Sequence, residues 1–168
     1  MSLILKTIKM TECKYYKNLP KKRMGTGVLF ANDKGELLIL KPVYKDGWTI
    51  PGGVIEADES PREACEREIK EEIGLDVKIK SFLCVDYKRD RIKDDCLQFI
   101  FYGGILTPEQ IENIKLPPEE ISEYKFLETD EAVSLLSKGL QSRIPSCLEA
   151  LKNNMPVYLE DGQKEFYG

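Results

Sequence analysis

Three glutamates, Glu68, Glu71 and Glu72, have the residue type and spacing that most clearly suggest chemistry. On an α-helix they lie within an arc of about 100°. Two carboxylates about 5 Å apart repel by roughly 3 kcal/mol at an effective dielectric constant near 20. A cation between them would remove this repulsion, and oxygen ligands favour Mg²⁺ or Mn²⁺. The helix alone also permits another interpretation, a solvated acidic face.

The chain contains no histidine. This excludes Ser–His and Cys–His nucleophilic pairs and zinc sites with histidine ligands. General acid–base catalysis would fall to carboxylates, lysine or tyrosine. The cysteines are scattered, odd in number and without a CxxC pair, so they indicate neither a disulfide framework nor a zinc site. They are Cys13, Cys65, Cys84, Cys96 and Cys147.

Length and charge predict one soluble domain that acts on a small molecule. A chain of 168 residues suits a single domain over 1–168, with the N-terminal ~20 and the C-terminal ~14 residues peripheral. The net charge of −4 argues against a broad nucleic-acid-binding surface. With no bilayer-spanning apolar run and no secretory signal, we expect a cytoplasmic protein without a membrane partner. Monomer and homodimer remain equally open.

The clearest predicted helix covers residues 60–73. Ser60 is suited to the N-cap, Pro61 to the first helical position, and Glu63 completes a capping box. Gly74 is suited to end the helix. The acidic cluster would border a buried apolar stripe that recurs every four residues, namely Cys65, Ile69 and Ile73.

The remaining pattern predicts an α+β domain with helices packed on a sheet. Residues 28–31 and 36–40 are typical of a β-hairpin around the turn formers at 32–35. Further strands are expected at 3–9, 48–50, 77–87, 96–106 and 123–127. Further helices are expected at 107–114, 130–137 (capped by Thr129) and 146–153, with loops at 42–47 and 88–95 and with 155–168 unassigned.

Residues 53–75 resemble the signature box of the Nudix hydrolase family at every specified position. The matching residues are Gly53, Glu59, Arg67-Glu68-Ile69, Glu71-Glu72 and Gly74-Leu75. The preceding Trp48-Thr49-Ile50-Pro51-Gly52 is also similar to the family's approach to the box. So many fixed positions over so short a stretch make a chance match very improbable.

The resemblance implies an α/β/α sandwich around a mixed sheet, with a catalytic loop–helix–loop. It implies that Glu68, Glu71 and Glu72 bind Mg²⁺ or Mn²⁺, with the Gly52 carbonyl as a further ligand. One glutamate, often the one at the position of Glu68, could instead be a general base. Arg67 is a candidate catalytic residue, but the resemblance favours a structural role for it. The box residues Gly53, Glu59 and Gly74 are also expected to be structural.

Other site residues are less sharply defined. A further acid in a late loop would be Glu119, Glu120 or Glu123, and at least two of these are expected to be solvated. Lys41, Arg89 and Glu123 are candidates for substrate binding. Lys41 could equally be a solvated strand end, whereas a solvated turn is favoured for Arg89 and its loop. The charged loop residues Lys88, Arg89, Arg91 and Lys93 could contact a polyphosphate. Base stacking or ordinary packing would explain Tyr16, Tyr44, Trp48, Tyr87 and Phe101.

These observations predict a metal-dependent pyrophosphohydrolase that cleaves a phosphoanhydride bond of a nucleoside diphosphate derivative. The region after the box lacks the proline of ADP-ribose pyrophosphatases and the tyrosine of many diadenosine polyphosphate hydrolases. A nucleoside triphosphate, standard or damaged, is therefore the preferred substrate. The alternatives are a nucleotide-sugar or ADP-ribose-type pyrophosphatase, a non-catalytic nucleotide-binding module, and an unrelated α+β protein.

Overall fold

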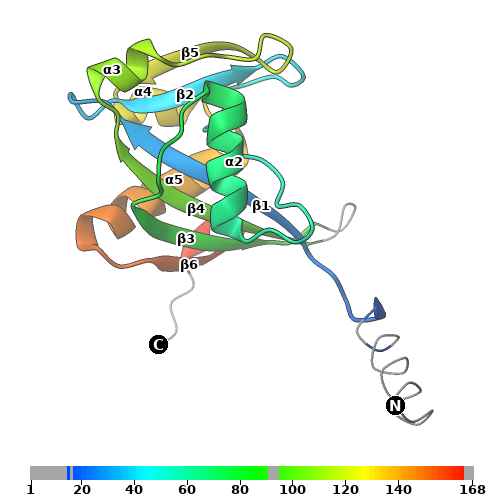
Figure 1. Cartoon of the computed structure of the whole chain (residues 1–168). Coiled ribbons are helices and arrows are strands. Elements are labelled where there is room, and N and C mark those ends of the chain that lie inside the picture. The colour runs from blue at the N-terminus through cyan, green and yellow to red at the C-terminus, as the bar shows by residue number, and fades with distance from the viewer. Residues whose placement is uncertain (1–14, 16, 91–94, 165–168) are drawn as a thin grey trace.

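The computed structural model describes residues 15, 17–90 and 95–164. The predicted strand at 3–9 lies outside the described residues, as do Cys13, Tyr16, Arg91 and Lys93. Within the described part, seven strands form one mixed sheet in the order β5-β2-β1-β4-β3-β6-β7 (Figure 1). The strands are β1 (Arg23–Ala31), β2 (Leu37–Pro42), β3 (Ser81–Lys88), β4 (Cys96–Ile105), β5 (Ile121–Leu127), β6 (Val157–Glu160) and β7 (Gln163–Lys164).

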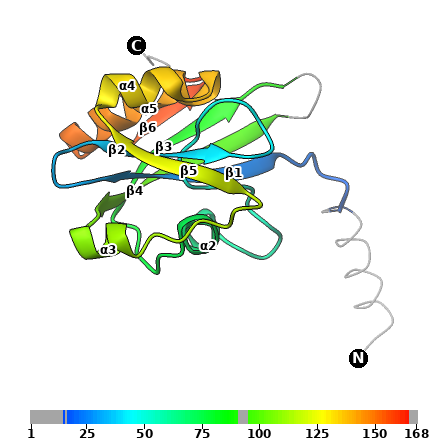
Figure 2. The same cartoon turned by 90° about the horizontal axis from the view of Figure 1, so that it is seen from above.

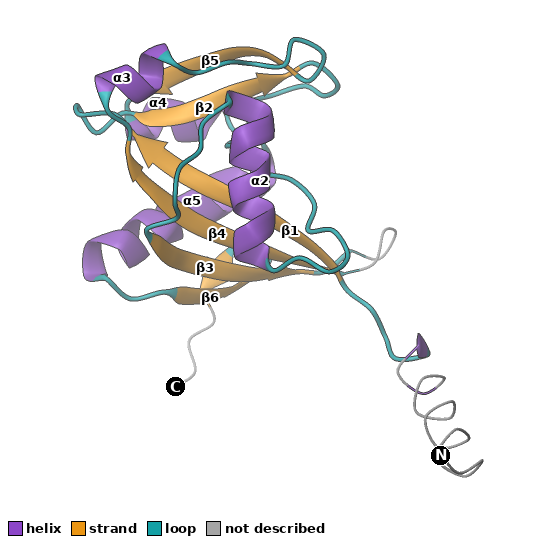
Figure 3. Ribbon diagram, in the orientation of Figure 1, coloured by secondary structure: helices purple, strands orange, loops and turns teal. Residues whose placement is uncertain are grey.

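Helices cover both faces of this sheet, as seen from above in Figure 2 and by element type in Figure 3. On one face lie α2 (Pro61–Ile73) and α3 (Pro108–Glu112). On the other lie α4 (Thr129–Leu135) and α5 (Lys138–Asn153). The β1–β4 and β3–β6 pairs are parallel, whereas the other strand pairs are antiparallel. The predicted α/β/α sandwich with a mixed sheet is therefore confirmed.

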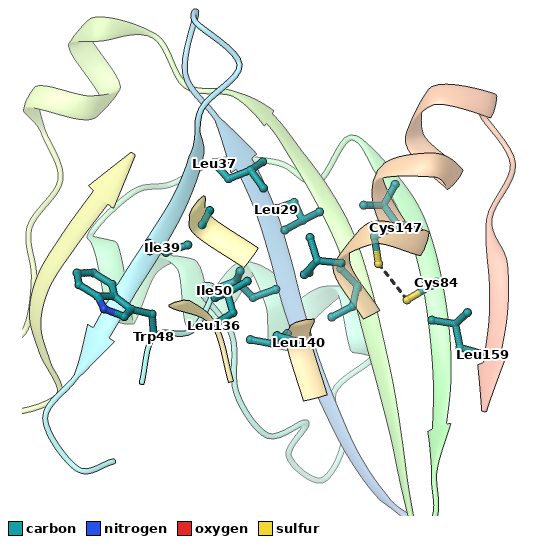
Figure 4. Packing of buried hydrophobic residues seen from close by; sticks show 14 residues of the cluster. Leu29, Leu37, Ile39, Trp48, Ile50, Cys84, Leu136, Leu140, Cys147 and Leu159 are labelled. Carbon is teal, nitrogen blue, oxygen red and sulfur yellow. Dashed lines mark hydrogen bonds between the residues drawn. The ribbon is translucent and has the colours of Figure 1, made fainter. Parts of the chain in front are cut away.

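Two apolar cores follow from the alternation of side chains along the strands. On β1, Val28 and Phe30 pack with Ile69 under α2. Leu29, between them in sequence, packs on the opposite face with Leu140 of α5, in the cluster that Figure 4 shows. A one-residue shift of β1 would exchange these faces, so the two cores together fix its register.

The segment from Trp48 to Ile55 fills a gap where β1 and β2 diverge. β1 pairs with β2 at Ala31–Leu37. Closer to its start, β1 bonds to this segment instead: Thr26 N donates to Gly53 O at 2.9 Å, and Val28 N donates to Pro51 O at 2.9 Å. The expected strand at 48–50 is accordingly not a full strand but a pair of isolated bridges. This insertion holds the start of the signature box directly against the sheet.

The capping signals of α2 are confirmed. Ser60 Oγ accepts from Glu63 N, and the Glu63 side chain accepts from Ser60 N. Gly74 ends the helix in the left-handed conformation with φ 72°, a conformation that glycine adopts without strain. Because both ends are fixed, the helix presents its acidic residues at defined positions.

Three boundary predictions were wrong. The strand expected from 77 begins only at Ser81, because residues 77–80 bury Ile79 without joining the ladder. Glu128, not Thr129, is the N-cap of α4, without a side-chain cap bond. The last helix begins at Lys138, eight residues before the expected start, and contains Pro145. Burial of one face of α5 outweighs the hydrogen bond that proline removes.

Within the C-terminal stretch that the sequence analysis left unassigned and treated as peripheral, the described residues include β6 and β7. Leu159 of β6 is fully buried. Asp161 and Gly162, both with positive φ, form the turn between the strands, and an Asp-Gly pair is a strong hairpin signal. Across the described residues, none of the helices combines the length and apolarity that a membrane span requires.

Candidate active site

Two glycines begin the candidate site, and close approach of neighbouring groups requires both. Gly52 has φ 143°, and a Cβ there would overlap the Thr26 carbonyl and Gly27 Cα of β1. A Cβ on Gly53 would overlap the carboxylate of Glu68. The glycine pair therefore lets the α2 carboxylates lie against the main chain of the inserted segment.

Glu72 is the most buried acid of the predicted cluster, with 4% of its surface exposed. Its Oε2 accepts a hydrogen bond from Gly52 N at 2.7 Å. The pKa of Glu72 is raised to about 7, chiefly by burial and also by the neighbouring charge of Glu68, while the Gly52 hydrogen bond acts in the opposite direction. A buried carboxylate with this environment gains strongly from a nearby positive charge.

Arg67 ties the box together. Its guanidinium donates to Glu59 twice, at 2.8 and 3.2 Å, to Glu68 at 2.8 Å and to Glu71 at 2.9 Å. It also donates to the Val54 carbonyl at 3.0 Å. These bonds join the loop before α2 to two turns of the helix.

The charges around Glu68 and Glu72 single out Glu120 among the three late acids. Burial raises the pKa of Glu68, and Glu71 and Glu120 add to that rise against the lowering effect of Arg67. Glu120 also contributes to the raised pKa of Glu72, which Lys45 lowers. Glu119 is exposed.

The donor set fits a divalent metal ion. Glu68 and Glu72 offer hard oxygen ligands, and both have raised pKa values because negative charge gathers where water is partly excluded. Within the described residues, no three acidic, cysteine or histidine side chains already converge as a complete metal cage. Glu71, with 55% of its side chain exposed, points to Arg67. Glu68 and Glu72 are therefore the best-placed candidate ligands, and Glu71 is a further candidate.

A cavity of about 710 Å³ adjoins the glycine pair on the α5 face of the sheet. Its floor is formed by β1 and β4, where Gly25 and Gly27 carry no side chains. Five cationic residues and one acidic residue, Asp90, line the cavity, and this excess of positive charge would favour an anionic ligand. The cationic residues are Lys22, Arg23, Lys45, Lys88 and Arg143. Gly52 connects the cavity with the acidic cluster. Its main chain lines the cavity, and its N–H donates to Glu72.

The three predicted substrate-binding residues lie elsewhere. Lys41 stands over the Trp48 ring at 5.9 Å. Glu123 is opposite Lys41 in the ladder and pairs with Lys125 at 3.3 Å. Arg89 pairs with Glu160 and, at 3.0 Å, with Asp161 at the β6–β7 turn. None of them is among the residues that line the large cavity.

The aromatic candidates also separate. Trp48 and Phe101 are buried in the two cores, and Tyr87 donates to Asp95 at 2.5 Å. Tyr44 is 66% exposed, and its pKa is raised by partial burial and by the charges of Glu72, Glu120 and Glu68. Tyr44 therefore lies close enough to the acidic cluster to be affected by its charge.

Sequence reasoning missed a buried ion pair at the far wall of the cavity. Arg143 of α5 donates through Nε and Nη2 to Asp86 Oδ2 of β3, at 2.9 and 2.7 Å. Asp86 Oδ1 accepts from Gly162 N at 3.0 Å. The sequence signal was weak, because no local pattern predicts a contact between one arginine in an uncertain helix and one aspartate in a distant strand. Gln98 and Lys45, which also line the cavity, were not singled out either.

Comparisons with known proteins agree with this architecture. A family model described as the NUDIX domain matches residues 21–149. An RNA pyrophosphohydrolase of Hydrogenovibrio crunogenus is 32% identical over 117 residues, covering 61% of this chain and 70% of that protein. An RNA pyrophosphohydrolase of Marinomonas sp. is 44% identical over 54 residues, which are 32% of this chain and only 34% of that protein.

Solved structures share the fold. The MutT protein of Methanosarcina mazei Go1 superposes with a TM-score of 0.64 at 22% identity, covering 82% of this chain and 99% of that one. The family model spans most of the chain, and its match includes the glycine pair and the acidic helix. The chain therefore belongs to the Nudix hydrolase family.

Proposed function

We propose that this protein is a metal-dependent pyrophosphohydrolase that cleaves a phosphoanhydride bond of a nucleoside triphosphate. The observation that carries the proposal is the contact of Glu68 and Glu72 with the Gly52–Gly53 main chain, at the edge of a cavity with cationic walls. A polyphosphate at this edge would lie between a cation-binding cluster on one side and basic side chains on the other.

The acidic residues would hold Mg²⁺ or Mn²⁺, with Glu68 and Glu72 as principal ligands and Glu71 and the Gly52 carbonyl as further candidates. A divalent cation, when bound, supplies positive charge to phosphate oxygens and lowers the pKa of a coordinated water. Arg67 keeps Glu68 and Glu71 in place through its hydrogen bonds. Glu120 is the acid of the late loop best placed to influence the site, since it affects the pKa of both Glu68 and Glu72.

Lys45 is suited to contact the substrate's phosphates. It lines the large cavity and also lowers the pKa of Glu72, so its charge acts on both regions. An ammonium group in this position would attract a phosphate chain toward the acidic cluster. Lys88 lines the same cavity, whereas Arg89 is engaged with Glu160 and Asp161.

A second candidate substrate is a 5′-triphosphorylated RNA end. The curated relatives described above are named RNA pyrophosphohydrolases, and such an end carries the same triphosphate as a free nucleotide. This candidate differs from the expectation, based on the acidic net charge, that the protein does not bind nucleic acid. A cationic cavity within an acidic protein would reconcile the two.

The test is a substrate panel with products identified by mass spectrometry. Nucleoside triphosphates, ADP-ribose, a nucleotide sugar and a 5′-triphosphorylated oligoribonucleotide are each incubated with Mg²⁺, with Mn²⁺ and with EDTA. We expect hydrolysis of a triphosphate only with metal. Equal product with metal and with EDTA, or cleavage of no substrate, would refute the proposal, and preferred cleavage of ADP-ribose would replace the substrate class.

The matched variants are Glu72→Gln and Glu66→Gln. Both lie on α2, but Glu66 is on the far side and pairs with Arg62 and Lys78 at 3.2 and 2.9 Å. Glu72→Gln should abolish most of the metal-dependent product, whereas Glu66→Gln should keep it. A similar loss in both would indicate a general effect on the helix and not a metal site.

A further inference from the structure

The side-chain amide of Gln98 lies at the polar end of the cavity floor, where it could contact the face or the edge of a planar ligand. Gln98 of β4 lies between Gly25 of β1 and Asp86 of β3 in the ladder register. A Cβ added to Gly25 would lie 2.7 Å from Gln98 Nε2 and 2.9 Å from Oε1. The amide therefore leans over the bare main chain of β1, inside the cavity that both residues line.

The neighbours of Gln98 hold its amide at one end. Gln98 Nε2 donates to Cys96 Sγ at 2.7 Å. A primary amide has two N–H donors and one carbonyl acceptor, so one N–H and the carbonyl oxygen remain for a ligand. A donor and an acceptor side by side are what a nucleobase edge pairs with, as in the bidentate amide contacts to adenine.

The adjacent wall is rigid and charged. Arg143, with 4% of its surface exposed, lines the cavity while Nε and Nη2 bond to Asp86. Asp86 is itself held by Gly162 N. A cavity of about 710 Å³ lies within the roughly 300–1,000 Å³ typical of small-molecule sites. The space suits a planar heterocycle with its phosphates toward Gly52 and Gly53.

We propose that Gln98 is a specificity-determining residue that reads the hydrogen-bonding edge of the substrate's nucleobase, with Gly25 leaving room for the amide and Arg143 fixing the wall beside it. This inference rests on the proposed nucleotide hydrolysis. It assigns Gln98 no part in bond cleavage, so changes at Gln98 act on which base is accepted.

The kinetic test compares wild type with Gln98→Leu, Gln98→Glu and Gly25→Ala on ATP, GTP, CTP and UTP with Mg²⁺. Wild type should discriminate among the bases, and Gln98→Leu should lower kcat/KM for the preferred nucleotide at least ten-fold, chiefly through KM. Gln98→Glu removes the donor and leaves only acceptors, so it should shift preference toward ATP, GTP and CTP, whose exocyclic amino groups donate, and away from UTP, which has none. Gly25→Ala displaces the amide without altering its chemistry and should also flatten the discrimination.

Gln163→Leu is the control, because Gln163 is exposed on β7 and does not line the cavity. It should keep the wild-type ranking of bases, and all variants should keep the wild-type melting temperature within a few degrees. Equal kcat/KM for all four bases in wild type, or an unchanged ranking in Gln98→Leu and Gln98→Glu, would overturn the role of Gln98.

Binding separates this inference from the proposed function. Isothermal titration with the four nucleoside monophosphates in EDTA measures base recognition without catalysis. If wild type hydrolyses no nucleotide but binds monophosphates with a base preference that Gln98→Leu removes, the proposed function fails and the role of Gln98 stands. If wild type hydrolyses nucleotides but Gln98→Leu keeps the wild-type ranking of bases in both binding and kinetics, the proposed function stands and the role of Gln98 fails.

Discussion

Arg67 and Arg143 each organise carboxylates on one face of the sheet, and they do so differently. Arg67 bonds to three glutamates, all within residues 59–71, and 27% of its side chain is exposed. Among the described residues, the acidic partner of Arg143 is Asp86, 57 positions away in sequence, and both side chains are at most 5% exposed. The first cluster is local and partly hydrated, whereas the second is buried and depends on packing.

The difference separates two uses of an ion pair. Around Arg67, more carboxylates than cations gather, so negative charge is left over for a metal ion. Around Arg143, the charges balance and the remaining Asp86 oxygen is satisfied by Gly162 N. A balanced buried pair contributes little binding capacity of its own but is costly to break. The α2 face therefore carries the excess negative charge that the proposed metal site needs, and the pair on the α5 face shapes the cavity.

The largest expected effect is on stability, from Arg143→Met. Removing one partner of a buried pair leaves an uncompensated charge and costs about 3–5 kcal/mol. Urea unfolding should show this loss, and the double variant Asp86→Leu/Arg143→Met should recover part of it. A single-variant loss below about 1 kcal/mol would contradict the balanced-pair interpretation.

The next effect is a pH dependence that arises on the α2 face. The pKa of Glu72 is raised in the folded protein from 4.5 to about 7, so the folded state keeps a proton that the unfolded state releases. Stability from this group is therefore present at low pH and is lost as pH rises from about 4.5 to about 7, by up to about 3 kcal/mol. In EDTA, the melting temperature of Glu72→Gln relative to wild type should rise between pH 5 and pH 8. A constant difference across this range would contradict the assignment.

Activity should fall ten-fold or more in Glu72→Gln and in Glu71→Gln, with a larger loss in Glu72→Gln because Glu72 is buried beside Gly52. A ten-fold loss in kcat corresponds to about 1.4 kcal/mol of transition-state stabilisation. Steady-state kinetics at saturating Mg²⁺ would measure it, with far-ultraviolet circular dichroism to show that the fold is kept. Wild-type turnover in either variant would remove that glutamate from the proposed site.

The smallest effect is expected from Arg67→Lys. Lysine keeps the charge but cannot reproduce the five hydrogen bonds that the guanidinium makes. We expect kcat to fall several-fold with little change in melting temperature, because the cluster is partly exposed. Arg62→Lys, at the exposed pair with Glu66, is the control and should be neutral. Equal effects in both would show that Arg67 does not position the glutamates.

The sequence predicted α2 closely because its signals are local. Ser60, Pro61, Glu63 and Gly74 act within a few residues of the helix ends. The same reasoning failed for α5, because Pro145 argues locally against a helix that one buried face stabilises. It also missed β6, although the Asp161-Gly162 turn was visible, because a four-residue strand needs its neighbour β3 to be stable.

By itself, the sequence determined the family, the acidic helix and the absence of histidine chemistry, since these depend on residue identity and on spacings shorter than one helix. Only the tertiary structure decided that Glu72 is buried against Gly52, that Glu120 lies near enough to raise the pKa of Glu72, and that Gln98 and Arg143 share a cavity. Those relations join residues 20 or more positions apart. They arise from sheet register and helix packing, which no local pattern encodes.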